Sequence, residues 1–245
     1  MYGYYLTFMV LILICSGFCM RASAKVKSAF DAYSEIPTSS RMTGYDTAKR
    51  LLRIHGAGDI SVEKVRGKLT DHYHPTKRSV NLSESVFGDD SVAAVAVAAH
   101  EVGHVLQKKS GYFPYKIRAV LVPITNFGSR LAFPLVLVGL ILDISVGFGQ
   151  SASLGFYLAM AGVVLYGLST VFAFATLPVE FDASRRAKKM LVEEGILTED
   201  ELPYADKMLG AAAQTYVAST LLSLVYFLRF LVWVLMIFGG RRRRD

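Results

Sequence analysis

Residues 92–109, VAAVAVAAHEVGHVLQKK, carry two histidines and a glutamate in a run that is otherwise mostly alanine and valine. His100, Glu101 and His104 spell the pattern H-E-x-x-H. Side chains four residues apart share one face of a helix, so both imidazoles can reach one metal ion. Glu101 then lies beside the metal, where a carboxylate can take a proton from a bound water. The pattern predicts a hydrolytic metal centre.

A third protein ligand is expected downstream, because zinc in catalytic sites takes three protein ligands and keeps one position for water. No histidine follows at the short metzincin spacing. Glu180 is the favoured candidate, since it lies one turn into a helix that we expect to begin at Pro178. The competing carboxylates lie off that face or in a charged run: Asp182, Glu193 and Glu194. We predict one zinc ion per chain, held by His100, His104 and Glu180.

The tract LTDHYHP, residues 69–75, holds a second pair of histidines. His72 and His74 alternate on an extended segment and would share a face. We expect His74 to line the cleft or to bond locally, rather than to form a second metal site. Acyl transfer also needs a donor for the developing oxyanion. Four residues remain unranked candidates for this donor: His74, Tyr216, Arg185 and Arg186.

Three local elements must position these side chains. Residues 43–56 open with Thr43 as an N-cap and close with Gly56, which predicts a short helix. Residues 60–86 alternate around a polar, proline-containing turn, which predicts a small hairpin or meander. Within it, residues 78–85 are expected to form an edge strand open to an extended substrate. Residues 89–111 begin with acids and end with bases, as in a helix whose charges complement its dipole.

The composition indicates that part of the chain faces lipid. The 53% hydrophobic content and the mean hydropathy of +0.38 are high for a soluble domain of 245 residues. The net charge of +7 comes from bases that cluster between apolar runs, which favours anionic lipid as a partner and not nucleic acid. Cys15 and Cys19 lie in the first apolar run and indicate no disulfide framework.

The predicted fold is a mainly α-helical integral membrane protein with a zincin-like catalytic lobe, a small β-sheet and three to four transmembrane helices. Its five expected segments differ in hydropathy along the chain. They are a transmembrane anchor (1–21), a soluble zincin-like subdomain with the H-E-x-x-H helix (22–130), a transmembrane hairpin (131–176), a helix with the third zinc ligand (177–216), and a C-terminal apolar segment with a basic tail (217–245).

The bases Arg21, Lys25 and Lys27 follow the first apolar run, and none precedes it. This favours a retained anchor over a cleaved signal peptide, with the N-terminus outside. We therefore expect a multi-pass protein of the cell membrane with its catalytic lobe on the cytoplasmic side. Four complete spans would place the arginines at 241–244 outside, against the positive-inside rule. Arg229, midway along the last run, makes an incomplete span an alternative, and the question stays open.

Four motifs resemble the YugP-type membrane zinc metallopeptidases of the neutral zinc metallopeptidase family: AAHEVGHVLQ, LTDHYHP, VPITNFGSRL and LPVEFDASRRA. The similarity runs from residue 25 to the last apolar run. The layout more distantly resembles the membrane-embedded gluzincins, including the heat-shock membrane protease and the prenyl-protein protease. The resemblance implies zinc bound by His100, His104 and Glu180, with Glu101 as general base.

One position departs from those distant relatives. They carry an aspartate four residues after the ligand glutamate, as a partner for a histidine ligand. This chain has Ser184 there, and its nearby acid is Asp182. The outer partner of the histidines therefore stays open between Ser184, Asp182 and a group from elsewhere.

We predict a membrane-bound zinc endopeptidase that cleaves peptides or membrane proteins near the bilayer surface. The sequence does not indicate its oligomeric state. An intramembrane protease is one alternative, but the apolar run from 92 to 106 is shorter than the roughly 20 residues that a span needs. The other alternative is a non-catalytic membrane scaffold with structural zinc. Structural zinc sites usually have four protein ligands.

Overall fold

The computed structural model describes residues 2–145 and 154–239. Its elements in chain order are α1 (Tyr2–Ser34), α2 (Gly44–Ile54), β1 (Ser61–Val65), β2 (His72–His74), β3 (Ser79–Ser83), α3 (Glu84–Phe87), α4 (Val92–Lys109), α5 (Phe113–Ser145), α6 (Leu154–Glu193) and α7 (Leu202–Gly239). The chain divides into two compact units. The apolar unit contains Met1–Cys19, Ile117–Thr176 and Val217–Asp245, and the site unit contains Met20–Lys116 and Leu177–Tyr216.

Two helices of the site unit begin at side-chain caps, and the sequence predicts the one at Thr43. Thr43 and Asp46 form a reciprocal capping box at the start of α2. The Ser91 hydroxyl accepts a hydrogen bond from the Ala94 N–H at 3.2 Å and caps α4. Helix α4 lies at the centre of the unit's core, with nearly all of its residues from Val92 to Val105 buried. The metal-binding pattern is thus carried by a helix that packing holds on all sides.

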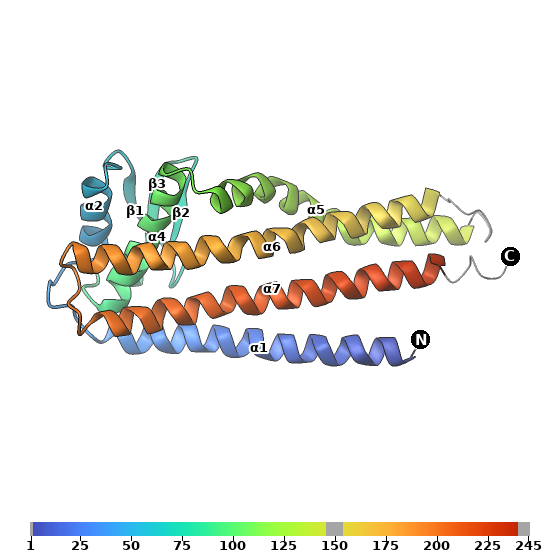
Figure 1. The fold of residues 1–245 in the computed structure, drawn as a ribbon, viewed down its shortest axis with the longest axis horizontal. Helices are drawn as coiled ribbons and strands as arrows, with labels where there is room; N and C mark the ends of the chain where they lie inside the picture. The colour runs from blue at the N-terminus through green and yellow to red at the C-terminus, as the bar shows by residue number, and fades with distance from the viewer. Residues whose placement is uncertain (1, 146–153, 240–245) are drawn as a thin grey trace. The chain divides into compact units, whose positions relative to one another are not determined.

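The site unit has a three-stranded sheet in the order β1-β3-β2, beside α2 and α4 (Figure 1). Strand β1 pairs parallel with β3, and β2 pairs antiparallel with β3. Strands β2 and β3 form the expected hairpin around the proline-containing turn, but the expected edge strand at 78–85 is wrong, because β3 lies in the middle of the sheet. All five residues of β3 are buried, because Val80 and Leu82 belong to the hydrophobic core. The strand thus takes the centre, and β2 lies at an edge.

Helix α6 does not begin at Pro178, contrary to the expectation from sequence. It runs from Leu154 to Glu193 with Pro178 inside. Proline removes one backbone hydrogen bond and usually kinks or ends a helix, but apolar helices packed against neighbours accommodate it. In the site unit, the Tyr112 hydroxyl donates to the Pro178 carbonyl at 3.5 Å. The apolar run and Glu180 therefore belong to one continuous helix.

Gly103 allows α4 and α6 to approach closely. A Cβ atom added at Gly103 would lie 2.8 Å from the Ala183 carbonyl oxygen and 3.2 Å from the Ala183 Cα. Both neighbours are backbone atoms, so they cannot move aside as a flexible side chain would. A residue without a side chain at this position therefore sets the separation of the two helices that carry the predicted ligands.

Replacing Gly103 by alanine is expected to destabilise the site unit by about 1–3 kcal/mol, because the added methyl group overpacks the helix contact. The thermal unfolding midpoint of the detergent-solubilised protein should fall. Gly210→Ala is the matched control, since Gly210 is also helical and nothing lies within 4 Å of an added Cβ there. An unchanged midpoint for Gly103→Ala would contradict the close approach.

The apolar unit is built from parts of four long helices. Gly139 and Gly162 let α5 and α6 pack tightly, with added Cβ atoms 2.4 Å from the Gly155 carbonyl and 2.5 Å from the Ala132 carbonyl. Helices α6 and α7 lie side by side, joined by a 3.1 Å contact between the Thr170 and Ser223 hydroxyls (Figure 1). Residues 146–153, within the hairpin predicted at 131–176, lie outside the described residues.

Three described helices, α1, α6 and α7, are long and apolar enough to cross a membrane. A fourth candidate is α5, whose halves Phe113–Gly128 and Arg130–Leu142 are bent by 43°. Many large apolar side chains on these helices are exposed, among them Leu13 and Ile14 at 64% each. The predicted fold class, mainly helical with a small sheet and three to four candidate spans, is confirmed.

Candidate metal centre

His100, His104 and Glu180 come together in the site unit, and their ligand atoms all lie within 4.8 Å of one another. The two imidazoles come from one face of α4, and the carboxylate comes from α6. His100 Nε2 lies 3.2 Å from Glu180 Oε2, and His104 Nε2 lies 3.6 Å from the same oxygen. The Glu180 side chain is only 3% exposed. A buried carboxylate thus faces two imidazole nitrogens.

These spacings fit a tetrahedral zinc ion. Ligand atoms at 2.0–2.1 Å from such an ion are about 3.3 Å apart, and the two observed distances lie on either side of that value. Two histidines and one glutamate also match the donor set of known catalytic zinc sites, with one position left for water. The donor chemistry and the geometry of the described side chains therefore suit zinc.

The hydrogen bonds of Gln107 determine which nitrogen of His104 carries a proton. The Gln107 amide nitrogen donates to the Val179 carbonyl at 2.7 Å and to Asp182 Oδ2 at 3.0 Å. The Gln107 oxygen must then face His104 Nδ1, which lies 3.0 Å away and therefore donates. In a neutral His104 the lone pair of Nε2 is then directed at Glu180. Either a proton on Nε2 or a metal cation must therefore lie between the imidazole and the carboxylate.

The electrostatics of the two coupled groups agree with that conclusion. Burial disfavours the charged form of Glu180, but hydrogen bonds with His100 and His104 outweigh it and hold the pKa of Glu180 well below its usual range. Burial lowers the pKa of His104, but the Glu180 hydrogen bond and charge outweigh it and raise that pKa overall. Glu180 therefore remains an anion in the interior and attracts positive charge.

The outer nitrogens of the two histidines have different partners. Ser184 Oγ lies 3.2 Å from His100 Nδ1. Asp182 does not contact either imidazole: it accepts from Gln107, which contacts His104. The Asp182 side chain is 3% exposed and also pairs with Arg186 at 2.6 Å and with Arg185. Of the two residues left open from sequence, Ser184 contacts a histidine directly, and Asp182 reaches one through Gln107.

Gln107 is not among the site residues predicted from the sequence. It is fully buried, and it lies three residues after His104 on the same helical face. That spacing was the available signal, since a glutamine in an apolar helix needs partners for its amide. The partners themselves lie 72 and 75 residues away in the chain, beyond the reach of any local pattern.

Replacing Gln107 by leucine is expected to lower zinc affinity by about 10–100-fold, the usual effect of removing an outer hydrogen bond from a metal-ligating histidine. Competition with a coloured zinc chelator measures the affinity. Gln214→Leu is the matched control, because Gln214 bonds only Lys25 at the surface of the site unit. Equal affinities in the two variants would show that Gln107 does not orient His104.

Glu101, the predicted proton acceptor, is 7% exposed and comes from the same helix as both histidines. Asp71 lies within electrostatic reach of it. Burial raises the pKa of Asp71, two hydrogen bonds from Ser83 oppose the rise, and the charge of Glu101 adds to it. The bonds from the Ser83 N–H and hydroxyl measure 2.7 and 3.0 Å. They anchor the segment before β2 beside Glu101.

The remaining predicted site residues have other contacts. His74 Nδ1 accepts the Lys77 N–H at 3.2 Å, and the rings of His74 and His72 are 6.5 Å apart. Arg185 and Arg186, both candidates for the oxyanion donor, bind Asp182. Among the described residues, the group able to hold a metal contains neither His72 nor His74. The second metal site that we considered unfavourable therefore gains no support.

Comparisons with known proteins agree with this geometry. A family profile described as "Putative neutral zinc metallopeptidase" matches residues 7–235. A protein of Bacillus subtilis (strain 168) named "Putative membrane protease YugP" is 43% identical over 234 residues, which cover 96% of this chain and 98% of that protein. No solved structure is significantly similar to the chain.

Proposed function

Because the chain belongs to the neutral zinc metallopeptidase family, whose members are hydrolases acting on peptide bonds, we propose that it is a membrane-bound zinc endopeptidase. In this proposal His100, His104 and Glu180 hold one zinc ion per chain, and Glu101 is the general base. The observation that carries the proposal is the convergence of three buried or half-buried ligand atoms within 4.8 Å. Two of them come from α4, which also carries Glu101.

Zinc would supply Lewis acidity, which polarises a peptide carbonyl and makes a water acidic near neutral pH. The protein's own groups do the rest. Glu101 takes a proton from the attacking water and passes it to the leaving amine nitrogen. Gln107 and Ser184 hold the two imidazoles in fixed orientations. Burial of the site excludes most water and strengthens the electrostatic contacts of Glu180 and Glu101.

The edge of β2 is the proposed place for the substrate backbone. One side of β2 pairs with β3, and the sheet order makes β2 an edge strand. The strand lies against the end of α4, where Lys108 Nζ donates to the Pro75 carbonyl at 2.7 Å. An extended peptide can add to such an edge through main-chain hydrogen bonds. Peptides or extended segments of membrane proteins are the substrate class that this arrangement suits.

Two alternatives receive less support. A protease with its zinc inside a span would carry H-E-x-x-H on a membrane helix, but α4 has 18 residues, most of them buried in the core of the site unit. It is not among the described helices that could cross a membrane. A structural zinc scaffold would normally have four protein ligands, and the described group offers three.

The proposed orientation places the N-terminus outside and the site unit at the cytoplasmic face of the cell membrane. It rests on Arg21, Lys25 and Lys27, which follow the first apolar segment. The arginines at 241–244 lie outside the described residues, so the path of the C-terminal tail stays a prediction. Protease accessibility of tags at residue 90 and at the C-terminus would test this orientation.

Removing the metal tests the function directly. The full chain, purified in detergent, is expected to cleave members of a mixed peptide library, and a zinc chelator should reduce cleavage to background. Stoichiometric zinc should restore it, because the family and the donor set both indicate this ion. Cleavage that persists after zinc has been removed, as measured by metal analysis, would contradict the proposal.

A further inference from the structure

A cavity of about 400 Å³ lies within the apolar unit. None of its lining residues belongs to the metal centre. Its volume falls in the roughly 300–1,000 Å³ range of small-molecule sites. Most of the lining side chains are aromatic: Tyr5, Phe133, Tyr166, Tyr226, Phe230 and Trp233. These residues come from four different helices, so the cavity is formed by helix packing and not by one loop.

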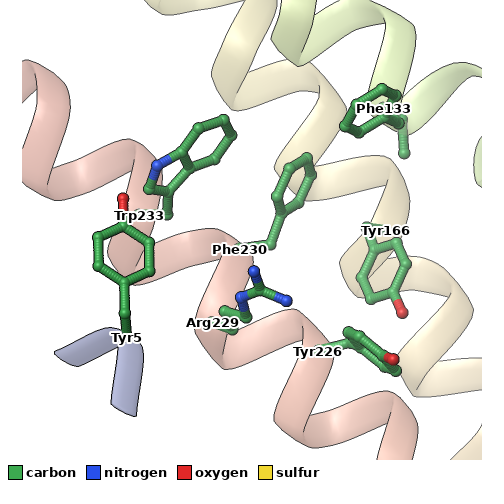
Figure 2. Close-up of a pocket in the computed structure, with 8 residues that line it drawn as sticks. Tyr5, Phe133, Tyr166, Tyr226, Arg229, Phe230 and Trp233 are labelled. Carbon is green, nitrogen blue, oxygen red and sulfur yellow. The ribbon is translucent and has the colours of Figure 1, made fainter. Parts of the chain in front are cut away.

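Arg229 places a cation in this aromatic surrounding. Its guanidinium lies amid the rings, with Tyr5 and Trp233 on one side and Tyr166 and Tyr226 on the other (Figure 2). The Arg229 backbone carbonyl accepts a hydrogen bond from the Tyr4 hydroxyl. Among the described side chains of the apolar unit none is acidic. Within that part of the chain, the guanidinium therefore has no counter-ion.

A charged side chain within a membrane-spanning segment is costly, and such residues almost always pair with a polar or charged group. Helix α7 is among the helices apolar enough to cross a membrane, and Arg229 lies within it. Tyrosine and tryptophan gather at the level of lipid headgroups, where their polar ends meet water and their rings meet acyl chains. Although Arg229 lies midway along the last apolar run, its long side chain can extend toward that level. Three tyrosines and one tryptophan surround it, and the partner available to a cation at that level is a lipid phosphate.

The cavity is also accessible from the side that lipid would occupy. Phe133 is 63% exposed, Tyr5 is 42% exposed and Tyr226 is 38% exposed. An amphiphile could therefore enter with its chain against Phe133 and Phe230. Its headgroup would then meet Arg229, whose planar fork of donors matches phosphate oxygens. A small inorganic anion has no apolar part that could pack against these aromatic side chains.

We propose that this pocket binds an anionic phospholipid, with the phosphate on Arg229 and an acyl chain among the aromatic rings. The tyrosine hydroxyls and the Trp233 indole N–H are further donors for the headgroup. This site is independent of the proposed peptidase activity, since it shares no residue with the metal centre. An anionic phospholipid differs from neutral lipids in its net charge and from free phosphate in its acyl chains, so both differences can be tested.

Trp233 makes the proposal directly measurable, because the chain has one tryptophan. The full chain in phosphatidylcholine nanodiscs would be mixed with small fractions of phosphatidylglycerol or phosphatidylcholine brominated on an acyl chain. Bromine quenches indole fluorescence only at close range. We expect brominated phosphatidylglycerol to quench Trp233 about fivefold more effectively than brominated phosphatidylcholine at equal fractions. Millimolar inorganic phosphate should not compete.

Variants separate the pocket from general surface charge. Arg229→Gln should abolish the preference while leaving quenching by brominated phosphatidylcholine unchanged, which shows that the helix remains in the bilayer. Arg130→Gln is the matched control, because Arg130 is an exposed arginine of the same unit that does not line the cavity. Equal quenching by both lipids, a preference that survives in Arg229→Gln, or displacement by inorganic phosphate would each overturn the proposal.

Discussion

Replacing Glu101 by glutamine is expected to slow peptide cleavage by about 10²–10⁴-fold while zinc stays bound, because only the proton acceptor is lost. Glutamine has nearly the same shape, and Glu101 is buried among α4 neighbours that a neutral amide does not disturb. The ligand atoms of His100, His104 and Glu180 are untouched by the change. Turnover of a fluorogenic peptide and zinc content by mass spectrometry, measured on the same sample, test both halves of the expectation.

Glu199→Gln provides the matched control for this variant. Glu199 is an exposed glutamate of the site unit, so its replacement removes the same charge at the surface. It should keep both zinc and activity. If the Glu101 variant holds zinc and cleaves peptides as fast as the parent, Glu101 is not the base. The scaffold alternative would then become the better account.

The second large effect is expected from Glu180→Gln, which should release zinc and abolish cleavage together. The neutral amide is a poor zinc ligand, and the variant removes the carboxylate that both imidazoles contact. Zinc affinity should fall by more than the roughly 10–100-fold that follows loss of an outer hydrogen bond. Metal analysis after dialysis against a weak chelator measures the loss, and circular dichroism checks that the helices remain.

Glu193→Gln is the control for position as well as for chemistry. Glu193 ends the same helix and pairs with Lys189 at 3.6 Å on an exposed face. The sequence alone offered it as a competing ligand, so the pair of variants tests that choice. Full zinc content in the Glu180 variant would move the third ligand elsewhere.

Local patterns were sufficient for several parts of this structure. The cap at Thr43 fixes where α2 begins, and the charges at the two ends of residues 89–111 indicate the extent of α4. The spacing of His100 and His104 places both imidazoles on one helical face without any knowledge of the fold. The candidate spans follow from hydropathy, because lipid selects apolar residues independently of packing partners.

Features that depend on contacts between residues far apart in the chain could not be predicted from the sequence. The order of the sheet depends on β3 lying in the core between β1 and β2. The alternation of polar and apolar residues within one strand does not show which strand pairs with it. Pro178 suggested a helix start, but the continuation of α6 is decided by its tertiary surroundings. The hydrogen bonds of Gln107 to Val179 and Asp182 join α4 to α6. The spacing of residues within one helix does not predict that these two helices are in contact.

The uninterrupted course of α6 limits how the length of the chain can vary. Each residue added to a helix turns everything beyond it by about 100° and advances it by about 1.5 Å. The side of α6 that meets Gly103 at Ala183 and the side that carries Glu180 therefore share one rotational phase. A one-residue insertion between Glu180 and Ala183 would put these two sides out of phase. A loop at that place would absorb the insertion. Along this stretch the number of residues is constrained as strictly as their chemistry.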